Sequence, residues 1–272
     1  MFKLRLLSTI LLLPLVVAGI LFLPDIYVAI ASGVVFMIAA WEWLHMTVMK
    51  TSKIRFILLL SLIVVAFSLL ALGFNHAWLY YLSLLCWLGG FVGVCFYPNG
   101  TVLWHDFFLM PFVGLLMFVP GWLAFNTLHA QLPYGPERVL LGCALIWGSD
   151  IGAYCCGKLW GKTKLAPQVS PGKTWAGFYG ALGTGCIVML GFYWWLQPSF
   201  SVIQALLLAL VTVIFAVIGD LVESMLKRIY GFKDSGNIIP GHGGMYDRID
   251  SMLSAFPIYF LGLQVLQNIS II

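Results

Sequence analysis

Nine long apolar runs divide the sequence, and they limit the folds open to the chain more than any other feature. Each is about 20 residues long, the length that an α-helix needs to cross a hydrocarbon layer ~30 Å thick. The runs cover residues 6–23, 26–48, 55–74, 78–97, 107–128, 138–157, 175–196, 202–224 and 251–270. With 62% hydrophobic residues and a mean hydropathy of +1.01, the chain is too apolar for a soluble domain. We therefore predict an all-α, polytopic integral membrane protein with about nine transmembrane helices.

The first 24 residues permit two interpretations. Lys3 and Arg5 precede an apolar run, as in a signal peptide, but the run is long and lacks a small-x-small cleavage site before Pro24. We favour a retained first span. No fixed-period repeat and no Pro/Ser-rich linker divides the chain. We expect one integral-membrane domain over residues 1–272, with the motif-bearing half at about 138–272.

The distribution of basic residues predicts the orientation of the chain. Lys and Arg near span ends are retained in the cytoplasm. If the N-terminus is cytoplasmic, all 14 Lys and Arg residues except Arg138 lie on the cytoplasmic side. The six cysteines lack metal-ligand spacing, and we interpret them as ordinary buried thiols.

Charged residues, only 9% of the chain, gather in two windows that this orientation places on the same face. The first window holds Asp150, Lys158, Lys162, Lys164 and Lys173. The second holds Asp220, Glu223, Lys227, Arg228, Lys233, Asp234, Asp247, Arg248 and Asp250. We expect the chemistry of the protein in these windows.

Carboxylates recur at helical spacing in the second window. Asp220, Glu223, Ser224 and Lys227 are three or four residues apart, so an extension of the 202–224 span presents them along one side. An ionised Asp near membrane depth is costly unless it is paired or bound to a metal. Asp220 is therefore a candidate functional residue, and an ion pair with a lysine at the interface is the alternative.

The segment GHGGMYDRID precedes the last span and combines flexible backbone with His242, Asp247 and Arg248. Glycines let backbone N–H groups approach phosphate oxygens, arginine binds phosphate with two hydrogen bonds, and carboxylates hold Mg²⁺. This composition suits phosphate and cation binding. A solvated turn is the simpler alternative.

The segment VSPGKTWAG resembles a nucleotide-binding P-loop only superficially. A P-loop needs a glycine five positions before Gly172, where this chain has Pro167. Ser170, Lys173 and Thr174 instead precede the 175–196 span, whose N-terminal amides favour an anion. We expect a phosphate contact there, and a plain capped helix start is the alternative.

Two further acids and one stripe of small residues complete the candidates. Asp150, in the sequence WGSDIGAY, could join a carboxylate set or accept a hydrogen bond in helix packing. Glu42 lies among tryptophans that suggest an interfacial belt, so we rank it lower. Small residues recur every four positions from Ala176 and from Gly177, a pattern that predicts close helix packing.

Three elements of the second window together resemble a known signature. S-M-L-K-R from Ser224, K-D-S-G from Lys233 and I-P-G-H-G-G-M-Y-D-R-I-D from Ile239 resemble the signature of bacterial phosphatidate cytidylyltransferases, also called CDP-diacylglycerol synthases. The resemblance extends to S-P-G-K-T-W at Ser170, D-I-G-A-Y at Asp150 and G-D-L-x-E-S at Gly219. It covers the C-terminal half by motif, and the first 130 residues carry little specific signal.

The resemblance implies that CTP and phosphatidic acid react to give CDP-diacylglycerol and pyrophosphate, with Mg²⁺ and a second, monovalent cation such as K⁺. It also implies a homodimer in the bacterial inner membrane, with the active site on the cytoplasmic side. Another CTP-dependent lipid cytidylyltransferase or kinase is an alternative. A transporter is a more distant one, because its charges would be spread through several spans.

If the resemblance holds, Asp220 and Asp247 are the main metal ligands. Asp150 and Glu223 are then further ligands, or residues that hold the ligands in place. Phosphate charge would be neutralised by Ser170, Lys173, Thr174, Lys227, Arg228, Lys233 and Arg248. The resemblance also implies that Asp234, in the K-D-S-G element, is a catalytic residue. His242 would donate to a phosphate or fix the glycine-rich loop.

Overall fold

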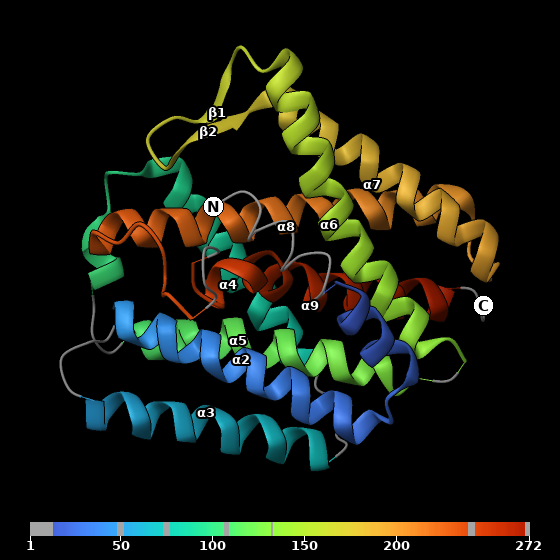
Figure 1. Ribbon diagram of the computed structural model, residues 1–272, viewed down its shortest axis with the longest axis horizontal. Helices are drawn as coiled ribbons and strands as arrows, with labels where there is room; N and C mark the ends of the chain where they lie inside the picture. The colour runs from blue at the N-terminus through green and yellow to red at the C-terminus, as the bar shows by residue number, and fades with distance from the viewer. Residues whose placement is uncertain are drawn as a thin grey trace.

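The protein is a bundle of long helices with one small hairpin (Figure 1). The computed structural model describes residues 13–47, 52–72, 77–105, 109–131, 133–238 and 243–269. Residues Leu13–Phe22 are helical and precede α2. The elements that follow are α2 (Asp25–Thr47), α3 (Ser52–Leu72), α4 (Ala77–Phe96), η1 (Thr101–His105), α5 (Leu109–His129), α6 (Gly135–Trp160), β1 (Lys164–Ala166), β2 (Ser170–Thr174), α7 (Trp175–Leu196), α8 (Val202–Tyr230) and α9 (Tyr246–Ile269).

Seven helices in the described part of the chain are long and apolar enough to cross a membrane, namely α2, α4, α5, α6, α7, α8 and α9. They confirm the prediction of an all-α, polytopic membrane protein. The count of nine spans and the cytoplasmic N-terminus stay predictions. Residues 6–12 of the first predicted span lie outside the described residues.

Two helices, α8 and α9, run furthest past the predicted ends of their apolar runs. α8 continues to Tyr230 instead of ending at 224, and Gly231 then ends it in the left-handed region at φ 76°. α9 begins at Tyr246 instead of 251. Polar residues end a hydropathy run without ending the helix. As a result Asp247 and Asp250 lie on the first turns of α9, where the sequence predicted a loop.

α9 lies at the centre of the packing. It contacts α2, α4, α5, α6 and α8, so it joins helices from both halves of the chain. Its Phe256 ring lies 5.2 Å from the Phe125 ring of α5, and its Phe260 ring lies 5.0 Å from the Tyr80 ring of α4. These large buried side chains hold α9 in place against the surrounding helices.

Small residues let α6 and α7 pack closely. A Cβ on Gly152 of α6 would lie 2.3 Å from the Thr184 hydroxyl and 2.6 Å from the Gly180 carbonyl of α7. On the other stripe, a Cβ on Gly185 would meet Val213 of α8 at 2.7 Å. The prediction that these stripes serve close helix packing is confirmed.

An antiparallel hairpin, which the sequence did not predict, connects α6 to α7. β1 pairs with β2 between Lys164 and Thr174 and between Ala166 and Ser170. The Thr174 hydroxyl accepts a hydrogen bond from the Gly177 amide and so caps α7. The Arg228 side chain of α8 donates to the Val169 carbonyl and ties the hairpin to the bundle.

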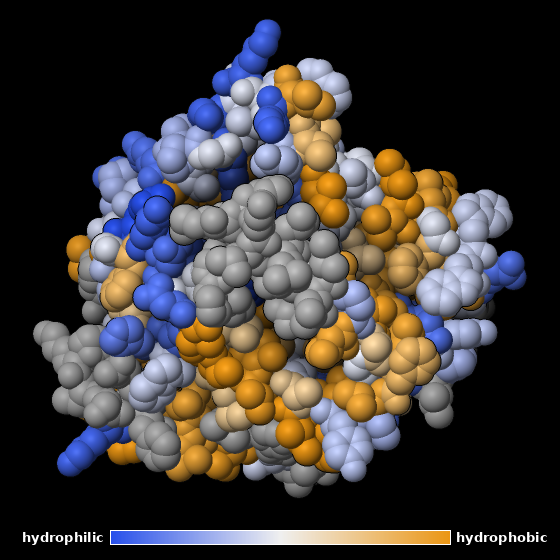
Figure 2. Space-filling view, viewed as in Figure 1, coloured by the Kyte–Doolittle hydropathy of each residue, from blue (hydrophilic) through white to orange (hydrophobic). Residues whose placement is uncertain are grey.

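Polar surface gathers at one end of the molecule. In Figure 2 hydrophilic residues lie toward the upper left, where Figure 1 places the hairpin and the C-terminal end of α8. Apolar surface covers much of the rest of this face. The two charged windows therefore meet at one end of the helix bundle.

Candidate active site

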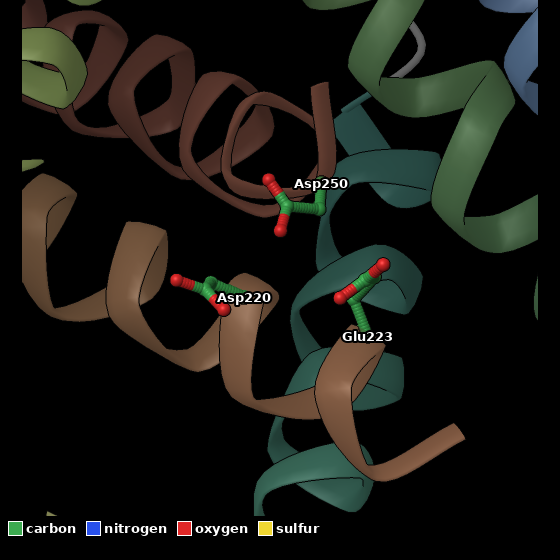
Figure 3. A group of neighbouring side chains, drawn as sticks. All are labelled: Asp220, Glu223 and Asp250. Carbon is green, nitrogen blue, oxygen red and sulfur yellow. The ribbon is translucent and has the colours of Figure 1, made fainter. Parts of the chain in front are cut away.

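Three carboxylates from two helices converge at the polar end. Asp220 and Glu223 of α8 face Asp250 of α9, as Figure 3 shows. One carboxylate oxygen of each residue lies within 4.8 Å of the others. Glu223 is almost fully buried, at 2% exposure. Three ionised carboxylates this close repel one another, so cations or protons must offset their charge.

Two lysines partly supply this compensation. Lys173 of β2 reaches α8, where its Nζ lies 2.7 Å from Asp220 Oδ2. Lys227 Nζ lies 2.7 Å from Glu223 Oε1 and 2.8 Å from Asp247 Oδ1. The lysine pair that was the alternative for Asp220 is thus present, and Asp220 belongs to the carboxylate cluster as well.

Asp247 is surrounded by hydrogen-bond donors. Its Oδ2 accepts from the backbone amides of Ser235 at 3.0 Å and Gly244 at 2.9 Å, while Oδ1 accepts from Lys227. The structure places Asp250, rather than Asp247, with Asp220 and Glu223. Its spacing three residues after Asp247 was the available signal, because both residues then share a helix side.

A polar cavity of about 490 Å³ surrounds the cluster. Its lining includes all three clustered carboxylates and further charged residues of both windows: Asp150, Lys227, Asp234, Asp247 and Arg248. It is large enough for a highly charged small molecule.

A second cavity of about 320 Å³ lies between α6, α7, α8 and the hairpin. Its lining is mainly apolar, with Tyr154 and Phe178, and includes Lys158 and Lys173. Three residues, Asp150, Asp220 and Ser251, line both cavities. The two cavities therefore adjoin at the edge of the carboxylate cluster, and two ligands could meet there.

The other predicted site residues take varied positions. Thr174 lines the second cavity, but its hydroxyl caps α7, which supports the capped-helix alternative. Ser170 and Lys233, both described, line neither of these two cavities. Arg228 is exposed and donates a hydrogen bond to the Val169 carbonyl of the hairpin. His242 lies outside the described residues.

Glu42 does not belong to an interfacial belt, so that interpretation is wrong. Glu42 is only 4% exposed and the neighbouring Trp43 is fully buried. The Trp43 ring packs against Phe118 of α5, which in turn packs against Tyr246 of α9. Hydropathy could not predict this position, because the Glu42 partners are about 200 residues away in the sequence.

The cluster is chemically suited to a hard divalent cation. Mg²⁺ prefers oxygen donors and is usually held by one or two carboxylates together with substrate phosphates and water. Asp220, Glu223 and Asp250 offer carboxylate oxygens at the wall of a polar cavity with room for a phosphate ligand. The donor set therefore fits the magnesium ion that the resemblance implies.

Comparison with known proteins identifies the family. The model of the cytidylyltransferase family matches residues 3–266. A phosphatidate cytidylyltransferase of Pseudomonas aeruginosa is 36% identical over 260 residues, which cover 95% of this chain and 96% of that protein. One of Haemophilus influenzae is 35% identical over 280 residues, with 95% and 97% covered. One of Bacillus subtilis is 46% identical over 129 residues, about half of either chain.

The chain belongs to the cytidylyltransferase family, and it is a nucleotidyltransferase. The resemblance stated from the motifs is thereby confirmed, and it extends over the first 130 residues as well as the motif-bearing half.

Proposed function

We propose that this protein transfers the CMP group of CTP to phosphatidic acid and releases pyrophosphate. The observation that carries the proposal is the carboxylate cluster of Asp220, Glu223 and Asp250 at the junction of two cavities. Both substrates are anionic and one is a lipid. A cation-binding cluster between a polar cavity and a mainly apolar one suits this pair of substrates.

We assign the polar cavity to the CTP phosphates and the second cavity to the phosphatidate headgroup. Lys227 and Arg248 would bind phosphate oxygens in the polar cavity. Lys158 and Lys173 would bind the lipid phosphate, while Tyr154 and Phe178 contact the start of its acyl chains. Asp150 lies at the boundary, since it lines both cavities.

In this arrangement a phosphatidate oxygen attacks the α-phosphorus of CTP, and the bond from that phosphorus to the β-phosphate oxygen breaks. The nucleophile is already ionised, so the protein mainly positions the two substrates and offsets their charge. Lys173 would hold the attacking phosphate. Lys227 and Arg248 would stabilise the charge that moves to the pyrophosphate.

Asp220, Glu223 and Asp250 would hold Mg²⁺, which offsets phosphate charge when it is bound. Asp150 stays a candidate ligand at the cavity boundary. Asp247, which the sequence predicted as a main ligand, would instead hold Lys227 and the loop backbone. A monovalent cation such as K⁺ and a homodimer remain expectations from the resemblance. Because Lys and Arg near span ends are retained in the cytoplasm, the site would lie on the cytoplasmic side of the inner membrane, where CTP is available.

A position-specific label tests the reaction. Purified, monodisperse protein is supplied with Mg²⁺, phosphatidic acid and CTP labelled at either the α- or the γ-phosphate. The proposal expects the α-label in lipid and the γ-label in pyrophosphate. The γ-label in lipid would indicate a kinase, and no labelled lipid would overturn the enzymatic proposal. Replacing phosphatidic acid with a polyprenol or an archaeal-type lipid distinguishes the related cytidylyltransferases.

A further inference from the structure

We propose that Glu42, from the N-terminal half of the chain, is a positioning residue for this site. The name signature loop is used for residues 231–238 and 243–245, the described residues between α8 and α9. Glu42 binds this loop and the start of α9, and through them it fixes Lys227 and Glu223. The proposal rests on the function proposed above and adds α2 to the catalytic apparatus.

Glu42 contacts the loop and the helix with the same carboxylate oxygen. Its Oε2 accepts a hydrogen bond from the Ser235 hydroxyl at 3.1 Å and one from the Tyr246 backbone amide at 2.9 Å. Tyr246 begins α9, whose first amides have no partner within the helix. The positive end of the α9 dipole also stabilises a negative charge at this position. Glu42 therefore acts as a cap supplied by a distant helix.

Two glycines allow the backbone to close around this carboxylate. A Cβ on Gly236 would lie 2.2 Å from Glu42 Oε1, and a Cβ on Gly244 would lie 2.4 Å from Oε2. Either contact is too short for a real side chain. Glu42 Oε1 has no hydrogen-bond partner within the described residues. Gly236 and Gly244 thus allow the close approach of a buried carboxylate.

Hydrogen bonds continue from Glu42 to the carboxylate cluster. The Ser235 hydroxyl, which donates to Glu42, accepts from the Asp247 amide at 3.3 Å. The Asp247 carboxylate accepts from the Ser235 amide and from Lys227 Nζ. Lys227 Nζ then contacts Glu223. Loss of Glu42 would release Ser235 first, then Asp247, and finally the lysine that neutralises Glu223.

The test compares two substitutions of Glu42. Glu42→Gln keeps an oxygen that can accept from Ser235 and Tyr246, whereas Glu42→Ala removes it. We expect Glu42→Ala to lower kcat about 10- to 100-fold, because small displacements of positioned groups are costly. KM for phosphatidate should change little. Glu42→Gln should stay within about threefold of wild-type kcat, since both donors keep their acceptor.

Two controls separate positioning from general damage. Glu137 lies in the first turn of α6, near neither described cavity, and Glu137→Ala should keep wild-type kcat. Ser235→Ala should lower kcat about 3- to 10-fold, and the Glu42→Ala/Ser235→Ala double variant should be no worse than Glu42→Ala alone, because both act through one path.

A readout independent of activity is cleavage by trypsin after Lys233, followed by mass spectrometry. Lys233 is exposed in the signature loop. Glu42→Ala should be cut faster than wild type there, and Glu42→Gln should not. If wild type makes no CDP-lipid, the proposed function fails while this arm still tests Glu42.

Several results would overturn the inference. One is wild-type kcat in Glu42→Ala. If Glu42→Ala cannot be purified as a monodisperse protein, wild-type kcat in Ser235→Ala would overturn the inference instead. Another is a Glu42→Gln variant as inactive as Glu42→Ala, because the charge itself would then be needed. Multiplicative losses in the double variant would exclude the path through Ser235. Unchanged cleavage after Lys233 in Glu42→Ala would show that Glu42 does not hold the loop.

Discussion

Asp247 and Asp250 are three residues apart at the start of α9, and both lie beside Glu223, yet the rest of their surroundings differ. Asp247 faces the signature loop and accepts hydrogen bonds from two backbone amides and Lys227. Asp250 faces α8, where its neighbours are the carboxylates of Asp220 and Glu223. A carboxylate surrounded by donors stabilises the local fold, whereas one among other carboxylates needs a cation or a proton to offset the repulsion.

The contrast between these two surroundings assigns different roles to two neighbouring carboxylates on one side of α9. Asp247 holds Lys227 and the loop backbone in place. Asp250 joins the oxygen donors at the junction of the two cavities. Substitutions of the two residues should therefore affect stability and turnover in different proportions.

The largest effect is expected for the carboxylate cluster. Asp220→Asn and Asp250→Asn should each lower CDP-lipid formation about 100-fold or more, with little loss of thermal stability, because each removes a metal ligand and relieves repulsion. The assay is labelled CTP with monodisperse protein. Asp25→Asn, which alters a carboxylate paired with His129 on α5, serves as the matched control. Near-normal turnover in either site variant would remove that residue from the metal site.

Asp247→Asn should show the opposite balance. We expect a fall of about 2 kcal/mol in the free energy of unfolding, since Lys227 and two amides lose a charged acceptor. Activity should fall about tenfold as the lysine moves. Denaturation in detergent and turnover are measured on the same sample. A loss of two orders of magnitude at unchanged stability would instead make Asp247 the metal ligand that the sequence predicted.

Lys173→Met should have a more selective effect. Lys173 contacts Asp220 and lines the second cavity, so its loss should raise KM for phosphatidate about tenfold, the value of one charge-assisted hydrogen bond. KM for CTP should change less. Steady-state kinetics in mixed micelles measures both constants. An equal rise in the two KM values would contradict the assignment of the cavities.

The smallest effect is expected for Thr174→Ala. Loss of the α7 cap should cost about 1 kcal/mol of stability, and Thr174→Ser should restore it. Turnover should stay within about twofold, because the hydroxyl is engaged by the Gly177 amide. A large loss of turnover at normal stability would return Thr174 to the phosphate-binding set.

Apolar run lengths predicted the helices well, because the cost of an unpaired backbone in hydrocarbon leaves the chain few alternatives. The α7 start at Trp175 matches the predicted span. The hairpin at 164–174 was missed, since its short strands contain Pro171 and Gly172 and lack alternation. The local pattern of apolar residues predicts a helix or strand only where it repeats with the period of that element.

The candidate site was predicted in part. Helical spacing brought out Asp220 and Glu223, which the structure places together. Asp250 was counted as a charge but given no role, because the last helix was predicted to begin one residue after it. Glu42 could not be assigned from local pattern, since its contacts with Ser235 and Tyr246 depend on how α2 packs against α9.

The most direct test of the metal cluster is Mn²⁺ binding, followed by electron paramagnetic resonance, in purified protein with CTP present. Mn²⁺ accepts the same oxygen ligands as Mg²⁺. We expect protein-bound Mn²⁺ in wild type and in Asp247→Asn, and a loss of at least tenfold in affinity in Asp250→Asn. Wild-type Mn²⁺ affinity in Asp250→Asn, with loss in Asp247→Asn, would contradict the account.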